Sequence, residues 1–280
     1  IAAERGRLMD YRMMVLDIDG TVNNSQKEVT PRTMEALWRL QESGVMVAVA
    51  SGRPPMGVAP VADILRLDRY GSYILGFNGA RIIDWRSKKC VYEKTLALHL
   101  PRKLLEDCAS WGLGMLTYDE THVIAATRPD RYMDIEAKIN RVPLTFPEDL
   151  DKLLQAPVNK CLLTGEPEDV AAAEEGLAEK YRHEAEVFRS EPYFLEVTPK
   201  HVDKAYCLSR LLGILEIPRG QVICVGDGYN DISMLQFAGV GVAMANAQPP
   251  VKAVADDVTR RDNDHDGVAE VVEKYFGISV

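Results

Sequence analysis

Two aspartates separated by one residue follow a short apolar run near the start of the sequence. The run Met13–Leu16 leads into Asp17, and Asp19 and Gly20 come directly after it. A carboxylate at Asp17 can attack phosphorus and form an aspartyl-phosphate. A carboxylate at Asp19 can protonate the leaving alcohol and then deprotonate the water that hydrolyses the intermediate. Taken alone, the pattern is equally typical of a solvated aspartate pair in a turn.

Two later apolar runs also end in residues that suit phosphate chemistry. Val45–Ala50 leads into Ser51 and Gly52, whose hydroxyl and backbone N–H groups can bind an anion. Val222–Val225 leads into a glycine-flanked turn that carries Asp227. Each pattern is weak by itself, and their value lies in occurring together and in order.

The turn after the third run adds Asn230 and Asp231. Mg²⁺ takes oxygen ligands and keeps several waters, so a few carboxylates suffice to bind it. We expect Asp227 to join Asp17 and the backbone carbonyl of Asp19 around such an ion. Lys204 can supply the positive charge that phosphoryl transfer requires near the phosphate and the nucleophile.

A parallel sheet must bring these residues together. Apolar runs alternate with helical patterns at both ends of the chain, which predicts an α/β fold with right-handed crossovers. In such a sheet the site lies beyond the carboxyl ends of the strands. The predicted strands are Met13–Leu16, Val45–Ala50, Tyr73–Phe77, Val222–Val225 and Val240–Met244. Helices are predicted from Thr30-Pro31 to Gly44 and over Pro55–Leu65, Lys204–Leu212, Asn230–Phe237, Pro249–Ala255 and Val268–Tyr275.

The middle of the chain has a different pattern of predicted strands and helices. Between residues 85 and 190, short strand patterns alternate with helices, and the strands do not end in acidic residues or phosphate-type glycine turns. We therefore predict an inserted α+β domain over 85–190 and a core domain over 1–84 and 191–280.

Composition excludes several classes of function. The formal net charge is −9 and the pI about 5.2, without the basic stripe that a nucleic-acid site requires. The apolar runs are too short to cross a bilayer. Five cysteines without C-x-x-C spacing fit free thiols in the cytoplasm, and the polar residues 1–10 contain no signal-peptide core.

Several longer motifs together resemble the haloacid dehalogenase superfamily phosphatases, in particular the Cof-type subgroup with a class IIB cap. The match covers nearly the whole predicted core domain, and the pairing of D-x-D-G-T with G-D-x-x-N-D is highly specific. The motifs are LDIDGT (16–21), ASGRP (50–54), NGA (78–80), Lys204, VGDGYND (225–231), AGVGVAMANA (238–247) and DGVA (266–269).

The resemblance implies a Rossmann-like core, a mobile cap, and Mg²⁺-dependent hydrolysis of a small phosphorylated metabolite such as a sugar phosphate. It implies that Asp17 is the nucleophile and Asp19 the acid/base, and that Asp231 orients Lys204 or metal-bound waters. Asn78 would line the site. The implied metal ligands are Asp17, Asp19 and Asp227, and the implied phosphate-binding residues are Ser51, Gly52, Lys204 and Asn230.

One segment departs from the family pattern. The family commonly has a glycine-containing turn around its lysine, whereas this chain has His201-Val202-Asp203-Lys204-Ala205. The geometry of that loop is therefore open, and Lys200 is the alternative cation.

Three other interpretations stay open. A phosphomutase would use the same aspartyl-phosphate, and a catalytically silent phosphate-binding module would share the fold. The spacing from Asp262 to Glu273 also satisfies a calcium loop. That loop is solitary, however, and follows a predicted strand and turn, so we expect Asp266 to cap the terminal helix instead.

The substrate and the oligomeric state are not encoded in any readable pattern. Among the polar positions of the predicted cap, Tyr118, Arg128 and Arg189 are candidate specificity residues. No membrane or nucleic-acid partner is expected.

Overall fold

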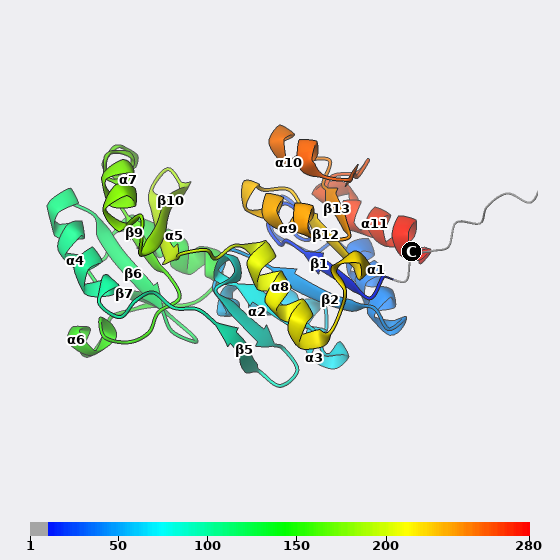
Figure 1. Ribbon diagram of the computed structural model, residues 1–280, viewed down its shortest axis with the longest axis horizontal. Helices are drawn as coiled ribbons and strands as arrows, with labels where there is room; N and C mark the ends of the chain where they lie inside the picture. The colour runs from blue at the N-terminus through cyan, green and yellow to red at the C-terminus, as the bar shows by residue number, and fades with distance from the viewer. Residues whose placement is uncertain (1–10) are drawn as a thin grey trace, which may run out of the picture. The chain divides into compact units, whose positions relative to one another are not determined.

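The computed structural model describes residues 11–280 (Figure 1). Residues 1–10, for which the sequence predicts no secretory leader, lie outside the described residues. The chain divides into two compact units, and each is described by itself. The first, called the core unit, comprises residues up to 52 together with 59–91 and 203–280. The second, called the inserted unit, comprises residues 53–58 and 92–202.

The core unit contains an eight-stranded sheet in the order β14-β13-β12-β1-β2-β3-β4-β5. Neighbouring strands from β14 to β3 are parallel, and β3 pairs with β4 in antiparallel fashion. The strands are β1 (Met13–Leu16), β2 (Met46–Ala50), β3 (Tyr73–Gly76), β4 (Arg81–Asp84), β5 (Lys89–Glu93), β12 (Val222–Gly226), β13 (Val240–Ala243) and β14 (Asp257–Val258).

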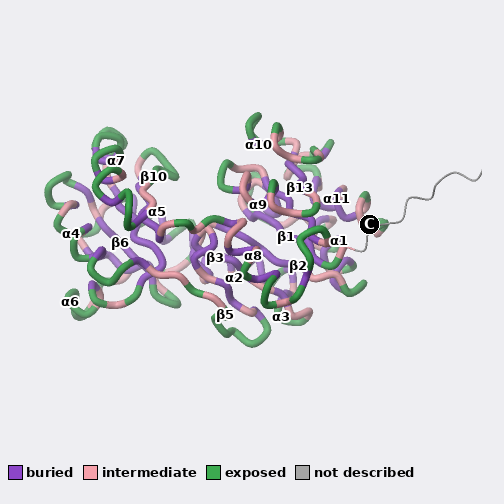
Figure 2. Tube along the Cα trace, in the orientation of Figure 1, coloured by how far each residue is buried: buried purple, intermediate pink, exposed green. Residues whose placement is uncertain are grey.

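The central strands are short and apolar because both faces of the sheet are covered. Every residue of β1 and β12 is buried, which is the burial that near-continuous apolar runs predict for a parallel sheet (Figure 2). Leu16 of β1 lies opposite Val225 of β12 and Val49 of β2. This register brings the chain that follows each strand to the same edge of the sheet. The predicted α/β class is confirmed.

Helices connect these strands, and two pairs pack closely: α1 with α11, and α8 with α9. The predicted start of α1 is confirmed, since the Thr30 side chain accepts a hydrogen bond from Thr33 N and Pro31 occupies the first helical turn. The helices are α1 (Pro31–Glu42), α2 (Pro55–Ile64), α3 (Leu67–Tyr70), α8 (Lys204–Leu215), α9 (Ile232–Phe237), α10 (Pro249–Val254) and α11 (Gly267–Phe276), with short 3₁₀ turns η1 (Phe77–Gly79), η2 (Arg219–Gln221), η3 (Tyr229–Asp231) and η4 (Asn263–His265).

The inserted unit is built on a six-stranded sheet in the order β10-β11-β9-β6-β7-β8. Its strand pairs are antiparallel except β7 and β8, which makes it an α+β unit. Its strands are β6 (Gly114–Tyr118), β7 (Val123–Ala125), β8 (Leu144–Thr145), β9 (Cys161–Thr164), β10 (Ala185–Glu191) and β11 (Phe194–Pro199). Its helices are α4 (Leu100–Trp111), α5 (Arg131–Asn140), α6 (Leu150–Leu153) and α7 (Pro167–Tyr181).

Strand pairing shifts both limits of the insertion from those predicted. Residues 85–190 were expected to form it, but β5 joins the sheet of the core unit and β11 pairs with β9 and β10. The limits therefore lie near residues 91 and 202. A strand's sheet membership depends on its distant partner, which the local pattern of Lys89–Glu93 or Phe194–Pro199 does not reveal.

No helix within residues 11–280 combines the length and apolar character needed to cross a membrane. The longest of those described above, α7, has 15 residues and carries several acidic side chains.

Candidate active site

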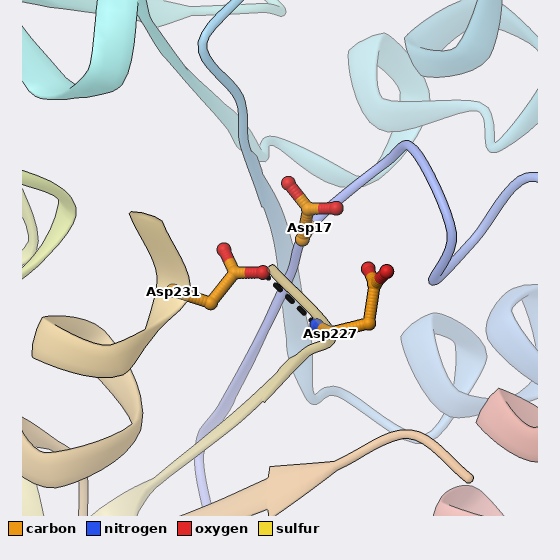
Figure 3. Close-up of side chains that lie close together, drawn as sticks. All are labelled: Asp17, Asp227 and Asp231. Atoms are coloured by element: carbon orange, nitrogen blue, oxygen red, sulfur yellow. Dashed lines mark hydrogen bonds between the residues drawn. The ribbon is translucent and has the colours of Figure 1, made fainter. Parts of the chain in front are cut away.

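Three aspartates of the core unit lie close together at the carboxyl edge of its sheet (Figure 3). Asp17 follows β1, Asp227 follows β12, and Asp231 lies in the turn after Asp227. Each offers a carboxylate oxygen, and these oxygens lie within 4.8 Å of one another. Residues 17 and 227 meet because β1 and β12 are adjacent parallel strands in register.

Lys204 is bonded to two of these carboxylates. Its Nζ atom lies 2.6 Å from Asp17 Oδ1 and 2.5 Å from Asp231 Oδ1, and its side chain is 1% exposed. Lys200, the alternative from the sequence, instead pairs with Glu186 at 3.0 Å in the inserted unit. The cation of this site is therefore Lys204.

The unusual residues around Lys204 build the start of α8. Asp203 is the N-cap, and its carboxylate accepts a hydrogen bond from Tyr206 N at 2.7 Å. Gly79, with φ of +105°, packs against this start, where a Cβ would collide with the Asp203 carbonyl oxygen and the Cys207 side chain. Here the N-cap aspartate and the close approach of Gly79 hold the lysine in place.

The electrostatics of the buried aspartates favour a bound cation. Burial raises the pKa of Asp17 well above its usual value, and the charge of Asp231 adds to the effect. Burial likewise raises the pKa of Asp227 to about 6, against the hydrogen bond from Thr21. Burial opposes the charge on Lys204, but the carboxylates of Asp17 and Asp231 outweigh it and raise the pKa of Lys204.

Asp231 uses both of its oxygens within the protein. Oδ1 accepts from Lys204. Oδ2 accepts from the backbone N of Asp227 at 3.0 Å (Figure 3) and from the backbone N of Gly228 at 2.9 Å. Asp231 therefore orients Lys204 and fixes the turn that carries Asp227.

Thr21, Gly20 and Asn246 complete the support of Asp227, a role that was not predicted for them. Thr21 Oγ1 donates to Asp227 Oδ1 at 2.8 Å. Gly20 has φ of +85°, and a Cβ there would collide with the Asp227 carboxylate. Asn246 Nδ2 donates to the Gly20 carbonyl oxygen at 2.8 Å. These residues lie inside the motifs LDIDGT (16–21) and AGVGVAMANA (238–247), and this position is the sequence signal that could have predicted their role.

Asp19 differs from the other aspartates in its environment. Its carboxylate accepts from Lys27 Nζ at 3.0 Å, and its side chain is 34% exposed. Asp231, and not Asp19, is the third member of the carboxylate cluster. A contribution of Asp19 to metal binding would therefore come through its backbone carbonyl, since its side chain is engaged with Lys27.

The residues predicted to bind phosphate lie on the loops after strands β2, β3 and β12 of the core sheet. Ser51 is buried, and its backbone carbonyl accepts from Asn78 N at 2.9 Å. A Cβ at Gly52 would lie 3.1 Å from Asn78 Oδ1, and the same oxygen accepts from Asn230 Nδ2 at 3.1 Å. Gly52, Asn78 and Asn230 are thus brought together, with Asn230 exposed.

The calcium-like segment uses its acidic side chains for other contacts. Asp264 accepts from Ser25, and Glu273 pairs with Arg32. Asp266 accepts from Thr30 Oγ1 at 2.5 Å. Asp266 occupies the N-cap position of α11, as predicted, but its side chain makes no capping hydrogen bond there, because the carboxylate is turned toward the start of α1.

The three specificity candidates have different environments in the inserted unit. Arg189 pairs with Glu174 at 2.5 Å, and Arg128 is exposed. Tyr118 is buried, and its hydroxyl donates to Glu136 Oε1 at 2.8 Å. Only Tyr118 therefore belongs to a buried polar group.

Known proteins of one family match this chain over nearly its whole length. The family model for haloacid dehalogenase-like hydrolases matches residues 14–272. A solved haloacid dehalogenase-like hydrolase from Bacteroides thetaiotaomicron is 44% identical, with a TM-score of 0.90 over 94% of this chain and 99% of its own.

Two curated relatives come from Bacillus subtilis. The 5-amino-6-(5-phospho-D-ribitylamino)uracil phosphatase YitU is 27% identical over 95% of this chain and 98% of its own length. Phosphatase YwpJ is 28% identical over 94% and 99% respectively. Together with the fold and the aspartate cluster, these matches show that the chain belongs to the haloacid dehalogenase-like hydrolases, as a Cof-type phosphatase.

Proposed function

We propose that this enzyme hydrolyses the phosphate monoester of a small metabolite through an aspartyl-phosphate on Asp17. The observation that carries the proposal is the buried contact of Asp17 with Lys204 beside Asp227. A carboxylate held at 2.6 Å by a buried ammonium has one oxygen fixed, so the other can be directed at a phosphorus atom.

The chemical steps follow from the two aspartates of the first motif. Asp17 attacks phosphorus, the bond from phosphorus to the alcohol oxygen breaks, and Asp19 gives its proton to that oxygen. Asp19 then takes a proton from water, the resulting hydroxide attacks phosphorus, and the bond to Asp17 breaks to release phosphate. Asp19 suits this exchange because its side chain is part-exposed and can reach both an alcohol and water.

The transferred phosphoryl group would be held from several sides. Ser51 and Gly52 would donate from the turn after β2, and Asn230 would donate its amide from the turn after β12. Lys204 would compensate the charge that builds up on the phosphoryl oxygens. These roles are supported by the common edge of the sheet and by the contact of Gly52 and Asn230 with Asn78.

The cluster has the charge and the donor atoms that suit Mg²⁺. Three carboxylates and one ammonium leave a formal charge of −2 at Asp17, Asp227, Asp231 and Lys204. Mg²⁺ would be held by Asp17, Asp227 and the backbone carbonyl of Asp19, with Asp231 orienting the site. When bound, the ion neutralises charge on the phosphate oxygens and the nucleophile.

A small phosphorylated metabolite is the proposed substrate class, with sugar phosphates as the leading example. The relative YitU is named for a phosphorylated ribityl compound, which supports a polyhydroxylated leaving group. The inserted unit is the proposed specificity element. The four buried cysteines are free thiols, which supports a reducing compartment such as the cytoplasm.

Phosphatase and phosphomutase differ in whether water reaches the aspartyl-phosphate. The part-exposed side chain of Asp19 favours hydrolysis, because a mutase must shield the intermediate. The test is to incubate the protein with Mg²⁺ and p-nitrophenyl phosphate or a hexose monophosphate, and to measure inorganic phosphate and phosphate migration in parallel. Release of phosphate without an isomeric product is expected, and an isomeric product would establish the mutase.

The nucleophile can be identified without turnover of a natural substrate. Beryllium fluoride should form an adduct on Asp17 when Mg²⁺ is present, and mass spectrometry or a crystal structure would locate it. An adduct on another aspartate would refute the assignment, and the silent-module alternative predicts no adduct and no phosphate release.

A further inference from the structure

A buried polar cluster lies in the inserted unit, apart from the aspartates described above. Its members are under one-tenth exposed, an unusual environment for residues that carry charge. They come from β6, α5, the residue before β9, and β11. We call it the inserted-unit cluster: Tyr118, Glu136, Asn140, Lys160 and Glu196.

Sheet alternation explains why the charged residues share one face. Leu195 and Val197 of β11 lie in the apolar core that the sheet forms with α4 and α7. Glu196, between them, points to the opposite face. Cys161 and Leu163 belong to the same apolar core, which places Lys160 on the face of Glu196. Lys160 and Glu196 therefore lie on the same face of the sheet, opposite the apolar core.

Hydrogen bonds, a cation–π contact and an ion pair connect these side chains into one network. Tyr118 Oη donates to Glu136 Oε1 at 2.8 Å, and Asn140 Nδ2 donates to the same oxygen at 2.8 Å. Lys160 Nζ lies 5.2 Å from the centre of the Tyr118 ring and 3.5 Å from Glu196 Oε1. The network therefore runs from α5 across Tyr118 to the lysine and Glu196.

The end of the network at Glu196 is not satisfied by the protein. Within residues 11–280, Glu196 Oε2 is buried and has no hydrogen-bond partner. Asn140 Oδ1 also lacks one, but it lies against Gly57, where a Cβ would collide with it. A buried carboxylate oxygen without a partner costs free energy, and the ion pair at 3.5 Å is too long to offset it fully.

We propose that Lys160 and Glu196 bind a hydroxyl group of the organic part of the substrate, and so determine specificity. A hydroxyl can donate to Glu196 Oε2, which has no partner, and can at the same time accept from Lys160 Nζ. Neighbouring hydroxyls on a polyol could extend the same pattern. That this hydroxyl belongs to a phosphate ester rests on the proposed function.

Charge argues for a neutral ligand. Glu136 and Glu196 against Lys160 give the cluster a formal charge of −1, which disfavours a second phosphate or a carboxylate. Tyr118 remains a neutral donor, since burial, followed by the charge of Glu136, raises its pKa well above the usual value. A sugar or polyol monophosphate matches this chemistry better than a bisphosphate.

The test compares selectivity between two substrates. Glu196→Gln and Lys160→Met are assayed with hexitol 6-phosphate and with p-nitrophenyl phosphate, which has no hydroxyls to offer. The ratio of kcat/KM for the hexitol ester over the nitrophenyl ester is expected to fall about tenfold or more in each variant. Glu196→Gln keeps the size of the side chain, so it guards against loss of folding.

Tyr181→Phe is the matched control. Tyr181 is also a buried tyrosine that donates to a carboxylate, Asp107 at 2.6 Å, but it belongs to the apolar-core side of the unit. The selectivity ratio should not change in this variant. Equal losses on both substrates in the Glu196 and Lys160 variants, or no change in the ratio, would overturn the proposal.

Failure of the proposed function would be recognised separately. If the wild type releases phosphate from neither ester, hexitol 6-phosphate binding is measured by calorimetry on Asp17→Asn, with and without Glu196→Gln. Binding weakened about tenfold by Glu196→Gln supports the cluster as a ligand site. Binding unaffected by Glu196→Gln, or absent in both proteins, refutes it. Tighter binding of hexosamine 6-phosphate than of the hexitol ester would also refute the neutral-ligand assignment.

Discussion

Lys204 Nζ lies 2.6 Å from Asp17 Oδ1, and both side chains are buried at the carboxyl edge of the core sheet. The two residues are 187 positions apart in the sequence. Their contact joins the end of β1 to the start of α8, with Asp231 as the second partner of the lysine.

Replacing the nucleophile should separate folding from catalysis. In Asp17→Asn the amide still fits the space and accepts from Lys204, but it cannot attack phosphorus. Turnover is expected to fall by at least about 10³-fold, while the midpoint of thermal unfolding stays near that of the wild type or rises, because a buried negative charge is removed. Steady-state kinetics and calorimetry measure the two effects, and substantial residual turnover would contradict the role of Asp17.

Removing the buried cation should destabilise the metal-free protein. Lys204→Met leaves Asp17 and Asp231 buried without a compensating charge, which costs about 3–5 kcal/mol of the free energy of unfolding. Urea unfolding in EDTA measures this. Lys274→Met is the matched control, because Lys274 pairs with Asp257 at the surface and its loss should cost less than about 1 kcal/mol. Similar losses in the two variants would refute the importance of the buried pair.

Alanine variants of two glycines with positive φ, Gly20 and Gly44, distinguish the effect of backbone strain from the effect of a collision with Asp227. Gly20→Ala places a methyl group against the Asp227 carboxylate, whereas Gly44→Ala, at φ of +95°, meets nothing within 4 Å. Both variants should lose about 1–2 kcal/mol of stability through backbone strain. Only Gly20→Ala should also weaken Mg²⁺ binding and turnover. Unchanged Mg²⁺ affinity in Gly20→Ala would show that Asp227 is not a ligand.

Proton binding should compete with Mg²⁺ at Asp227. The pKa of Asp227 is raised to about 6, chiefly by burial, so below pH 6 the metal-free side chain is protonated and must lose that proton to bind the ion. The Mg²⁺ affinity is expected to be constant well above pH 6 and to weaken up to about tenfold per pH unit below it. Calorimetric titration between pH 5 and 8 measures this, and an affinity that does not change across pH 6 would contradict it.

Protonation of Asp227 weakens Mg²⁺ binding, but the raised pKa means that it stabilises the folded state of the metal-free protein. Because the folded pKa of about 6 lies above the unfolded value of about 3.9, the folded state binds the proton more tightly. This contribution is present at low pH and is lost as pH rises through 6, at about 1.4 kcal/mol per unit in the window between the two values. The difference between wild type and Asp227→Asn, by urea unfolding in EDTA, should therefore shrink as pH falls from 7 to 5. A difference independent of pH would refute the shift.

Local sequence determined much of the fold and the chemistry. Apolar runs such as Met13–Leu16, in alternation with helical patterns, indicate buried parallel strands, and Thr30-Pro31 indicates a helix start. The residue types and order of Asp17, Asp19 and Asp227 indicate phosphate chemistry from the sequence alone. These signals are local, because each depends on the residue and its immediate neighbours.

Tertiary structure decided what depends on partners that are distant in sequence. It distinguished Lys204 from Lys200, made Asp231 and not Asp19 the third carboxylate of the cluster, and assigned Phe194–Pro199 to the inserted sheet. It also put Lys160 beside Glu196, where a buried oxygen remains unpaired. Burial and pairing are properties of the packed chain, and they determine which carboxylates share a charge, which pKa values shift, and which polar groups still need a ligand.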